Sequence, residues 1–297
     1  MSDYLWILFV VLYIVLAPFI GGLITGVDRK ITARMQGRYG PPLLQPFYDV
    51  FKLWQKENIV VNKHQKFYVL CFLIFIVVAG AIFFAGGDLL LSIFALTVAS
   101  IFLVVAAYST FSPYAYVGAE RELIQIMAYE PMLILTIVGM YIATRVEVGP
   151  GIWEGNFNVS HIASYEGLLV LKLPAIFLGF LFILTIKLRK SPFDISMSHH
   201  AHQEIVRGLT TEFSGKELAY IEIAHWYENV MLLGLVYLFF ASNPILAVLV
   251  VVATYFLEIL IDNVSSRLKW QSVLTSAWLV AFVLGTGNII AVLTFLK

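Results

Sequence analysis

The sequence predicts an all-α, polytopic membrane protein with about eight transmembrane helices and an amphipathic helix on the cytoplasmic side. The first observation is composition: 60% of the 297 residues are hydrophobic and only 13% are charged, whereas about a quarter of a typical soluble domain is charged. The second is that apolar runs of about 20 residues recur, the length that a helix needs to cross a bilayer. The third is that these runs lack the alternation of a membrane barrel, so their backbone groups must be satisfied within helices.

Eight apolar runs are predicted to span the bilayer. Their ranges are 4–25, 67–85, 89–107, 123–144, 168–187, 218–240, 244–262 and 272–295. The first run has no basic region before it and is longer than the core of a signal peptide, so we interpret it as a span and not as a cleaved leader. Because no tandem repeat or shift of composition divides the chain, residues 1–297 are expected to form a single transmembrane domain.

The distribution of basic residues predicts the orientation of the chain. With the N-terminus outside, 16 of the 19 Lys and Arg residues fall in inner connections, which leaves Arg145 and Lys297 outside and Lys172 within the fifth run. Basic residues concentrate in the inner loops of membrane proteins. We therefore expect a multi-pass protein with its N-terminus outside and with two long inner loops, at 26–66 and 188–217.

The first long inner loop contains an amphipathic stretch, LLQPFYDVFKLWQKE (43–57). Four of its apolar residues recur at helical spacing: Phe47, Val50, Phe51 and Trp54. The charged residues fall on another face, and Pro46 is well placed to start a helix. The stretch is too short and too charged to span, so we expect a helix that lies in the membrane interface or docks on a partner.

Carboxylates lie within the predicted spans, where a charge costs about 2.5–3.5 kcal/mol on insertion scales. They are Glu130, Glu222, Glu228 and Glu258, with Asp262 at the inner end of the seventh span. Glu222 and Glu228 lie on one broad side of the sixth span with His225 between them, and the two acids of the seventh are one turn apart. This pattern favours a wet, protonatable file that carries H⁺ or Na⁺. The alternative is a set of polar groups that join helices, with Lys172 or Arg121 as counter-charge.

The second long inner loop contains SPFDISMSHHAHQEIVRGLTTEF (191–213), which places three histidines among charged and apolar residues. Adjacent histidines do not share a helix face and no His-x3-His pair accompanies them, so no metal site is predicted. Interleaved apolar residues such as Phe193 and Ile205 favour a segment that packs against a partner or lines a cavity mouth, in preference to a solvated loop. Histidines near their ordinary pKa of about 6.5 can transfer protons there.

The chain holds little that could support redox chemistry by itself. Its single cysteine, Cys71, excludes an internal disulfide and an iron–sulfur cluster bound by this chain alone. The formal net charge is zero, which gives no indication of binding to nucleic acid. We expect no catalytic residue, no metal site and no cofactor in this chain, so any redox centre that it serves belongs to another subunit.

Three segments carry a resemblance to a known family. They are GRYGPPLLQPFYDVFKLWQKE (37–57), VGAERELIQIMAYEP (117–131) and SPFDISMSHHAHQEIVRGLTTEFSG (191–215). They resemble the signature loops of the membrane subunit that forms the quinone chamber of respiratory complex I, a family shared with energy-converting nickel–iron (NiFe) hydrogenases. The direct connection from Gly40 to Gln45, the double histidine of SMSHHAHQE and the motif IEIAHWYEN (221–229) are similar to the corresponding membrane subunit of the Ech-type hydrogenase.

This resemblance implies a non-redox subunit of a prokaryotic plasma membrane, which anchors a soluble electron-transfer arm and couples ferredoxin-dependent hydrogen evolution to H⁺ or Na⁺ translocation. The implied partners are the NiFe-hydrogenase large and small subunits, an iron–sulfur subunit and a second ion-pump-like membrane subunit. These partners would hold the NiFe centre and the iron–sulfur clusters. The alternatives are a proton-pumping complex I subunit, a pure membrane anchor and a stand-alone ion-coupled transporter, although no inverted repeat supports the transporter.

Two sets of residues follow from the spans and the resemblance together. The predicted ion-translocation residues are Glu130, Glu204, Glu212, Glu222, His225, Glu228, Glu258 and Asp262. The predicted residues of the soluble-arm interface and of the path mouth are Arg34, Arg38, Glu120, Arg121, Glu122, Asp194, His199, His200 and His202. The inner loops 26–66 and 188–217 are expected to dock the soluble arm.

Overall fold

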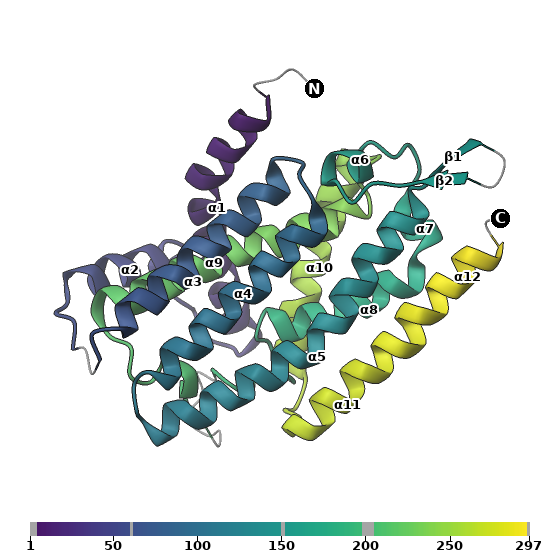
Figure 1. Ribbon diagram of the computed structural model, residues 1–297. Helices are drawn as coiled ribbons and strands as arrows, with labels where there is room; N and C mark the ends of the chain where they lie inside the picture. The colour runs from purple at the N-terminus through teal and green to yellow at the C-terminus, as the bar shows by residue number, and fades with distance from the viewer. Residues whose placement is uncertain (1–4, 60–61, 150–151, 198–204, 296–297) are drawn as a thin grey trace.

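The computed structural model describes residues 5–59, 62–149, 152–197 and 205–295 and confirms the all-α fold class (Figure 1). The first helices are α1 (Leu5–Met35), α2 (Gln45–Gln55), α3 (Gln65–Phe84), α4 (Leu89–Tyr108) and α5 (Pro113–Ala143). They are followed by α6 (Val159–Ala163), α7 (Leu169–Lys172), α8 (Pro174–Lys187) and the 3-10 turn η1 (Gly208–Thr210). The last helices are α9 (Gly215–Leu238), α10 (Pro244–Val264), α11 (Trp270–Val280), the π-helical turn η2 (Ala281–Thr286) and α12 (Gly287–Phe295). A small antiparallel hairpin, β1 (Val146–Gly149) with β2 (Ile152–Glu154), follows α5.

Within the described residues, six helical segments are long and apolar enough to cross a membrane, which confirms a polytopic membrane protein. They are Trp6–Met35, Gln65–Phe84, Leu89–Tyr108, Pro113–Ala143, Pro244–Val264 and Trp270–Thr294. The other two predicted runs are helical as well. α8 has 14 residues and is preceded by the short α7, whereas α9 has 24 residues but carries several charged side chains. We define the α2 end of the bundle as the end at which α1 and α8 finish and at which α5 and α9 begin.

Two helices extend beyond the predicted spans at the α2 end. α5 begins at Pro113 instead of residue 123, so Glu120, Arg121 and Glu122 lie on a helix and not in a loop as the sequence suggested. A hydropathy pattern ends a span at its first charges, but Pro113 at the first turn and the good helix formers from Ala119 to Leu123 continue the helix. α1 likewise continues to Met35, which places Arg34 in its last turn.

The fifth predicted span is broken into α7 and α8, and Asn288 of α12 closes the break. Its side-chain oxygen accepts hydrogen bonds from the backbone N–H groups of Ala175 and Ile176, both at 3.0 Å, and its amide donates to the carbonyl of Lys172 at 3.1 Å. The first N–H groups of a helix have no partner within the helix. Asn288 supplies that partner in an apolar setting, where an unsatisfied backbone group is costly.

Replacing Asn288 with leucine is expected to lower the free energy of unfolding by about 1–3 kcal/mol, because the buried N–H groups of α8 lose their acceptor. The measurement is the thermal unfolding midpoint of the purified protein in detergent. Ile290→Leu on the same helix, at a side chain that is 61% exposed, is the control and should leave the midpoint unchanged. Equal midpoints for the two variants would remove Asn288 from its capping role.

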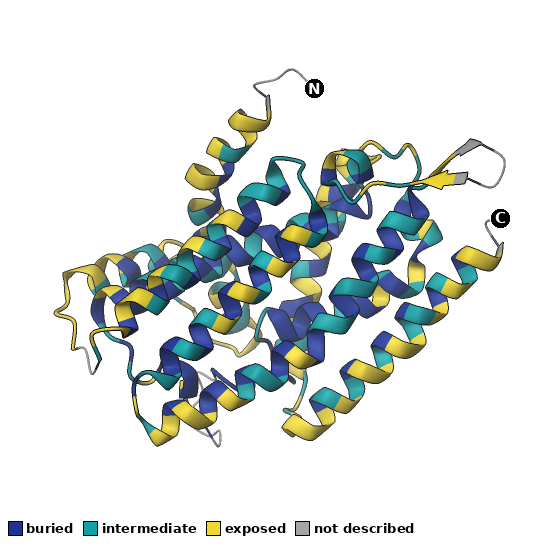
Figure 2. Cartoon of the chain, viewed as in Figure 1, coloured by how far each residue is buried: buried dark blue, intermediate teal, exposed yellow. Residues whose placement is uncertain are grey.

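Buried residues follow the inward faces of the helices, while α1, α10, α11 and α12 have few buried residues (Figure 2). α2 is the expected amphipathic helix, and its apolar stripe is divided between two surroundings. Phe47 packs against Trp226 of α9 with ring centroids 5.2 Å apart, and Val50 is buried beside it. Trp54 is 40% exposed and packs edge-on against Tyr220 of α9, with ring centroids 6.3 Å apart, whereas Phe51 is 60% exposed. Most of the stripe therefore holds α2 to the bundle, and Phe51 faces outward.

Candidate functional site

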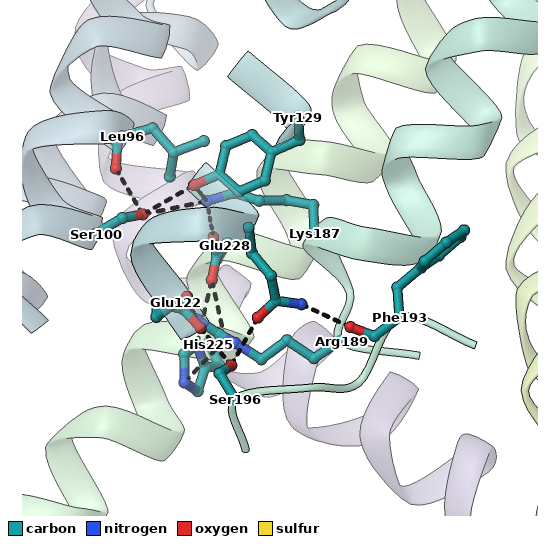
Figure 3. Close-up of polar contacts among 11 residues, drawn as sticks. Leu96, Ser100, Glu122, Tyr129, Lys187, Arg189, Phe193, Ser196, His225 and Glu228 are labelled. Carbon is teal, nitrogen blue, oxygen red and sulfur yellow. Dashed lines mark hydrogen bonds and ion pairs between the residues drawn. The ribbon is translucent and has the colours of Figure 1, made fainter. Parts of the chain in front are cut away.

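Lys187 is the centre of a buried polar network formed by α4, α5, α8 and α9 (Figure 3). Its ammonium nitrogen lies 2.7 Å from Oε1 of Glu228, and the two side chains are 5% and 3% exposed. The same nitrogen donates to the Tyr129 hydroxyl at 3.0 Å and to the Ser100 hydroxyl at 3.2 Å. An ammonium group has three N–H donors. All three therefore have acceptors, and the buried charge is fully satisfied.

Arg189, two residues after α8, joins this network to α5. Its guanidinium lies 2.9 Å from Oε1 of Glu122 and 3.8 Å from Oε2 of Glu228. It also contacts both ring nitrogens of His225, at 2.9 and 3.1 Å, and Nδ1 of that histidine lies 3.1 Å from Oε2 of Glu228. The other oxygen of Glu122 accepts from the Ser196 hydroxyl at 2.5 Å. The guanidinium of Arg189 thus contacts carboxylates from two helices, α5 and α9, together with the imidazole of His225.

The described part of this network is electrically balanced. Lys187 and Arg189 supply two positive charges, Glu122 and Glu228 supply two negative charges, and a neutral His225 adds none. Burial alone lowers the pKa of Arg189, but the facing carboxylates raise it above its ordinary value, so the guanidinium remains protonated. A balanced buried cluster avoids the large cost of an uncompensated charge. His225 is the member whose neutral form can accept one more proton.

Backbone conformation at the α2 end fixes Arg189 and Ser196 in place. Arg189 has a φ of +53°, which turns the chain sharply as it leaves α8. The Gln125 amide donates to the carbonyl of Phe193 at 2.6 Å and so ties this loop to α5. Two turns earlier on α5, Gly118 touches the backbone of η1, where any larger side chain would collide with it. The loop after α8 is thereby held directly against Glu122.

A second polar cluster joins α1 to α10. Lys190 forms an ion pair with Asp28 of α1 and lies 3.5 Å from Oδ2 of Asp262. The other oxygen of Asp262 accepts from the backbone N–H of Ser191 at 2.8 Å. Tyr255, two turns before Asp262 on α10, lines the same cavity as Asp28. Two consecutive residues after α8 therefore pair with carboxylates of different clusters: Arg189 with Glu122 of α5, and Lys190 with Asp28 of α1.

A polar cavity of about 540 Å³ connects the two clusters at the α2 end. Its lining includes Asp28, Arg189, Lys190, Glu222, His225 and Asp262. A neighbouring cavity, also of about 540 Å³, shares Asp194, Asp262 and Arg267 with the first. Hydrated ions or protons that entered from this end would reach both clusters.

Asp194 lies where the two cavities meet and pairs with Arg267 at 3.6 Å. Burial raises its pKa to about 6, opposed by Arg267 and reinforced by Asp262. A carboxyl with this pKa gains and loses its proton within the physiological range. Asp194 is thus suited to exchange protons with the cavities.

The raised pKa of Asp194 predicts a pH-dependent stability. A carboxyl whose pKa rises on folding binds its proton more tightly in the folded protein, so its contribution is full at low pH and is lost as the pH rises through about 6. The stability of Asp194→Asn relative to the unsubstituted protein should therefore increase by about 1 kcal/mol between about pH 5 and pH 7. Unfolding midpoints at the two pH values measure this. Glu166→Gln, at an exposed position, is the control, and an unchanged difference for Asp194→Asn would contradict the assignment.

The structure brings several of the predicted ion-translocation residues together. His225 and Glu228 belong to the network around Lys187, and Asp262 belongs to the cluster around Lys190. Glu222 lines the cavity between them. Glu258 is buried on α10, one turn from Asp262.

Two other members of that set lie apart from both clusters. Glu130 is half-buried on α5, next to Tyr129 in the chain but on a different side of the helix from Glu122, Gln125 and Tyr129. Glu212 is half-buried after η1. Glu204 falls outside the described residues, as do His199, His200 and His202 of the predicted path mouth.

The remaining residues predicted for the mouth lie at the α2 end. Glu122 is buried within the main network and not at its surface. Arg121 lines the neighbouring cavity and contacts the carbonyl of Ile195 at 3.4 Å, and Glu120 accepts from the Tyr108 hydroxyl at 3.1 Å. Arg34 lies over the ring of Tyr39, and Arg38 hydrogen-bonds to Gln36.

Sequence reasoning missed the basic half of the site. It named Lys172 and Arg121 as candidate counter-charges, but Lys172 donates to the carbonyl of Ala143 and lies over the ring of Tyr165. In the two clusters the cations that meet the carboxylates are Lys187, Arg189 and Lys190, and Arg267 pairs with Asp194 between the cavities. A signal was present, since KLRK ends an apolar helix, but basic residues at that position are also the ordinary mark of an inner loop.

Comparisons with known proteins agree with this architecture. The family model for NADH dehydrogenase matches residues 7–293. The chain is 28% identical over 241 residues to Hydrogenase-4 component C of Escherichia coli (strain K12), which covers 76% of this chain and 71% of that protein. It is 28% identical over 287 residues to a subunit of the F(420)H(2) dehydrogenase of Methanosarcina acetivorans, which covers 82% and 78%. A chain in the structure of the membrane-bound sulfane sulfur reductase, an archaeal respiratory membrane complex, superimposes with a TM-score of 0.80 and 25% identity, covering 96% of this chain and 99% of that one.

Proposed function

The chain belongs to the NADH dehydrogenase family, and from that premise we propose that it is the non-redox membrane subunit of an energy-converting NiFe-hydrogenase complex in a prokaryotic plasma membrane. In this role it anchors a soluble electron-transfer arm and couples ferredoxin-dependent hydrogen evolution to the translocation of H⁺ or Na⁺. Its relatives include a hydrogenase component and a chain of a respiratory membrane complex, so the chain is a membrane subunit of a respiratory-type complex. The hydrogenase assignment within that class is the proposal.

The buried network around Lys187 is the observation that carries the coupling role. It holds four charged groups and an imidazole within a membrane bundle, at contacts of 2.7–3.8 Å, beside a polar cavity. Polar networks of this kind inside a membrane mark ion or proton paths. The path begins in the cavity at Asp194 and Glu222 and continues through His225 to Glu228.

The arrangement suggests how redox work in a partner subunit moves an ion here. Arg189 contacts Glu122, Glu228 and His225 at once, so a small shift of its guanidinium changes which carboxylate is neutralised. A charge that arises near the cavity during electron transfer would attract or repel that guanidinium. His225 then accepts a proton when Arg189 moves away and releases it when Arg189 returns. The guanidinium of Arg189 is the moving part in this mechanism, while the backbone of its loop stays in place.

Exposed apolar side chains at the α2 end support docking of the soluble arm. Tyr39, Ile59 and Phe111 are 85%, 76% and 83% exposed and lie in connections outside the spans. With the predicted orientation, these connections face the cytoplasm. Large apolar side chains exposed to water at one end of a membrane bundle are typical of an interaction surface. The partners that would cover them are the NiFe-hydrogenase large and small subunits and the iron–sulfur subunit, and a second ion-pump-like membrane subunit would lie alongside in the bilayer.

A mild-detergent pull-down through a tag on this chain tests the proposal. We expect nickel and iron to accompany the chain, and the purified complex to evolve hydrogen from reduced ferredoxin. A triple variant of Tyr39, Ile59 and Phe111 to serine should lose these partners while it remains in the membrane. Matched serine substitutions at Val248, Val252 and Phe256, which are exposed on α10, should leave the soluble partners bound.

The structural similarity to the sulfane sulfur reductase complex favours a second candidate. In that case the soluble arm would reduce a sulfur substrate in place of protons. The pull-down would then yield iron without nickel, together with sulfur reduction by reduced ferredoxin. Iron with quinone reduction would favour a complex I subunit, and a lone chain without metal would favour a stand-alone transporter.

A further inference from the structure

Glu258 on α10 is a buried carboxyl that the network around Lys187 does not include. The residue is 1% exposed, and neither side-chain oxygen has a hydrogen-bond partner in the described part of the chain. Glu122 and Glu228, which are similarly buried, each receive hydrogen bonds or ion pairs on both oxygens. Glu258 therefore differs from these two glutamates, because no hydrogen bond from the described residues compensates a negative charge on its oxygens.

The position of Glu258 connects it to the polar cavity. Asp262 follows one turn later on the same face of α10 and lines the cavity, and Tyr255 lies one turn earlier and lines it too. Glu258 is thus one helical turn farther from the α2 end than Asp262. A group bound at Glu258 would reach the cavity by way of Asp262.

Burial has the largest effect on Glu258 and disfavours its ionised form; Lys190 opposes that effect and Asp262 adds to it. Among the described residues, those that act on it most are Lys190, in the loop after α8, and Asp262, on α10 itself. Lys190 is engaged by Asp28 of α1 and by Asp262, so the three groups already carry one negative charge in excess. A second buried carboxylate beside this excess would be strongly unfavourable. A neutral carboxylic acid at position 258 carries no such penalty.

A metal cation at the same position would need more ligands than a proton does. Hard cations such as Na⁺ need a shell of several oxygen ligands to replace their water. Within the described residues, no group of three or more His, Cys, Asp or Glu side chains is placed to hold a metal ion. A Na⁺ ion bound to Glu258 would need further oxygen ligands from backbone or hydroxyl groups, whereas a proton needs only one of the two carboxyl oxygens.

We propose that Glu258 is a proton-binding site that exchanges with the cavity through Asp262, so that the ion handled on the α10 side of the cavity is H⁺ and not Na⁺. In the exchange step, a rotation of the Glu258 side chain brings its O–H to the Asp262 carboxylate. The O–H bond of Glu258 then breaks as an O–H bond forms on Asp262, and Lys190 remains paired with Asp28 as the Asp262 carboxylate is neutralised. This inference deepens the proposed function by naming the ion. It rests on the proposed function only for the claim that this proton is translocated during turnover.

Infrared spectroscopy of the tagged chain, purified with its partner subunits at neutral pH, tests the proposal. A protonated carboxylic acid has a carbonyl band above the amide region, and the band shifts when H₂O is replaced by D₂O. We expect a shifting band that is lost in Glu258→Gln, is retained at a displaced position in Glu258→Asp, and is unchanged in Glu166→Gln. Asp262→Asn should retain the band but slow its shift.

Three outcomes would overturn the proposal. The spectrum above the amide region could be identical in the unsubstituted protein and in Glu258→Gln, which would mean that Glu258 is ionised. The band could fail to shift in D₂O, which would isolate Glu258 from the cavity. It could disappear when sodium chloride replaces choline chloride at equal ionic strength, which would make Glu258 a Na⁺ site. The resting complex is measured, so the result does not depend on hydrogen evolution, and a failure of the proposed function would appear separately in the pull-down.

Discussion

Replacing Lys187 with methionine is expected to destabilise the protein by about 3–5 kcal/mol, because the substitution removes one partner of a buried ion pair. Glu228 would keep its charge at a site where the side chain is 3% exposed, and its Oε1 would lose the ammonium group that lies 2.7 Å away. Tyr129 and Ser100 would lose their donor as well. The thermal unfolding midpoint and the yield of assembled complex measure the effect.

The double variant Lys187→Met with Glu228→Gln separates charge imbalance from loss of packing. It removes both charges of the pair, so most of the lost stability should return although the ion path is interrupted. Lys172→Met is the control for loss of a lysine, since this side chain donates to a backbone carbonyl and lies over a ring. Its cost should be about 1 kcal/mol. A double variant as unstable as Lys187→Met would show that the pair does not act through its charges.

Replacing Glu122 with glutamine is expected to abolish ion translocation while hydrogen evolution continues. The glutamine keeps the shape and can still accept from Ser196, but it removes the carboxylate that lies 2.9 Å from Arg189. Arg189 then shifts fully to Glu228, so that His225 remains beside a fixed cation and cannot be protonated. Ion uptake by inverted membrane vesicles, measured together with hydrogen evolution from reduced ferredoxin, should fall to the level found with an ionophore.

The control for Glu122→Gln is Glu166→Gln, which makes the same chemical change at an exposed position outside the network. It should transport ions normally. If Glu122→Gln vesicles transported ions at the normal ratio to hydrogen, the guanidinium exchange between the two carboxylates would be excluded. If hydrogen evolution and partner binding were also lost, Glu122 would have a structural role.

Much of the fold could be predicted from local sequence because the bilayer imposes a simple rule on it. Long apolar runs must form helices, and each of the eight predicted runs is helical in the structure. The amphipathic spacing in residues 43–57 likewise became α2. The resemblance to the complex I and hydrogenase family, carried by three loop motifs, is confirmed by the family model over residues 7–293.

The boundaries and the break in the fifth span were harder to predict. α5 extends through charged residues because Glu122 lies on a face that other chain segments cover, and hydropathy does not contain that information. The division between α7 and α8 depends on Asn288, more than a hundred positions away in the chain. Pro174 by itself did not predict that the fifth span is broken, because proline is also common in the first turn of an uninterrupted helix.

Composition, periodicity and motifs are local properties, so the amino-acid sequence was enough to establish the class of protein, six of the eight predicted spans, the family and most acidic members of the site. Which charges meet depends instead on the folded chain. Arg189 and Glu122 are 67 positions apart, Lys187 and Ser100 are 87 apart, and Lys190 and Asp28 are 162 apart. Ion pairs depend on distance in space, and a buried charge is tolerated only where packing brings its partner within a few ångströms. The packing of α1, α5, α9 and α10 around the KLRK segment therefore selects the partners of each buried charge.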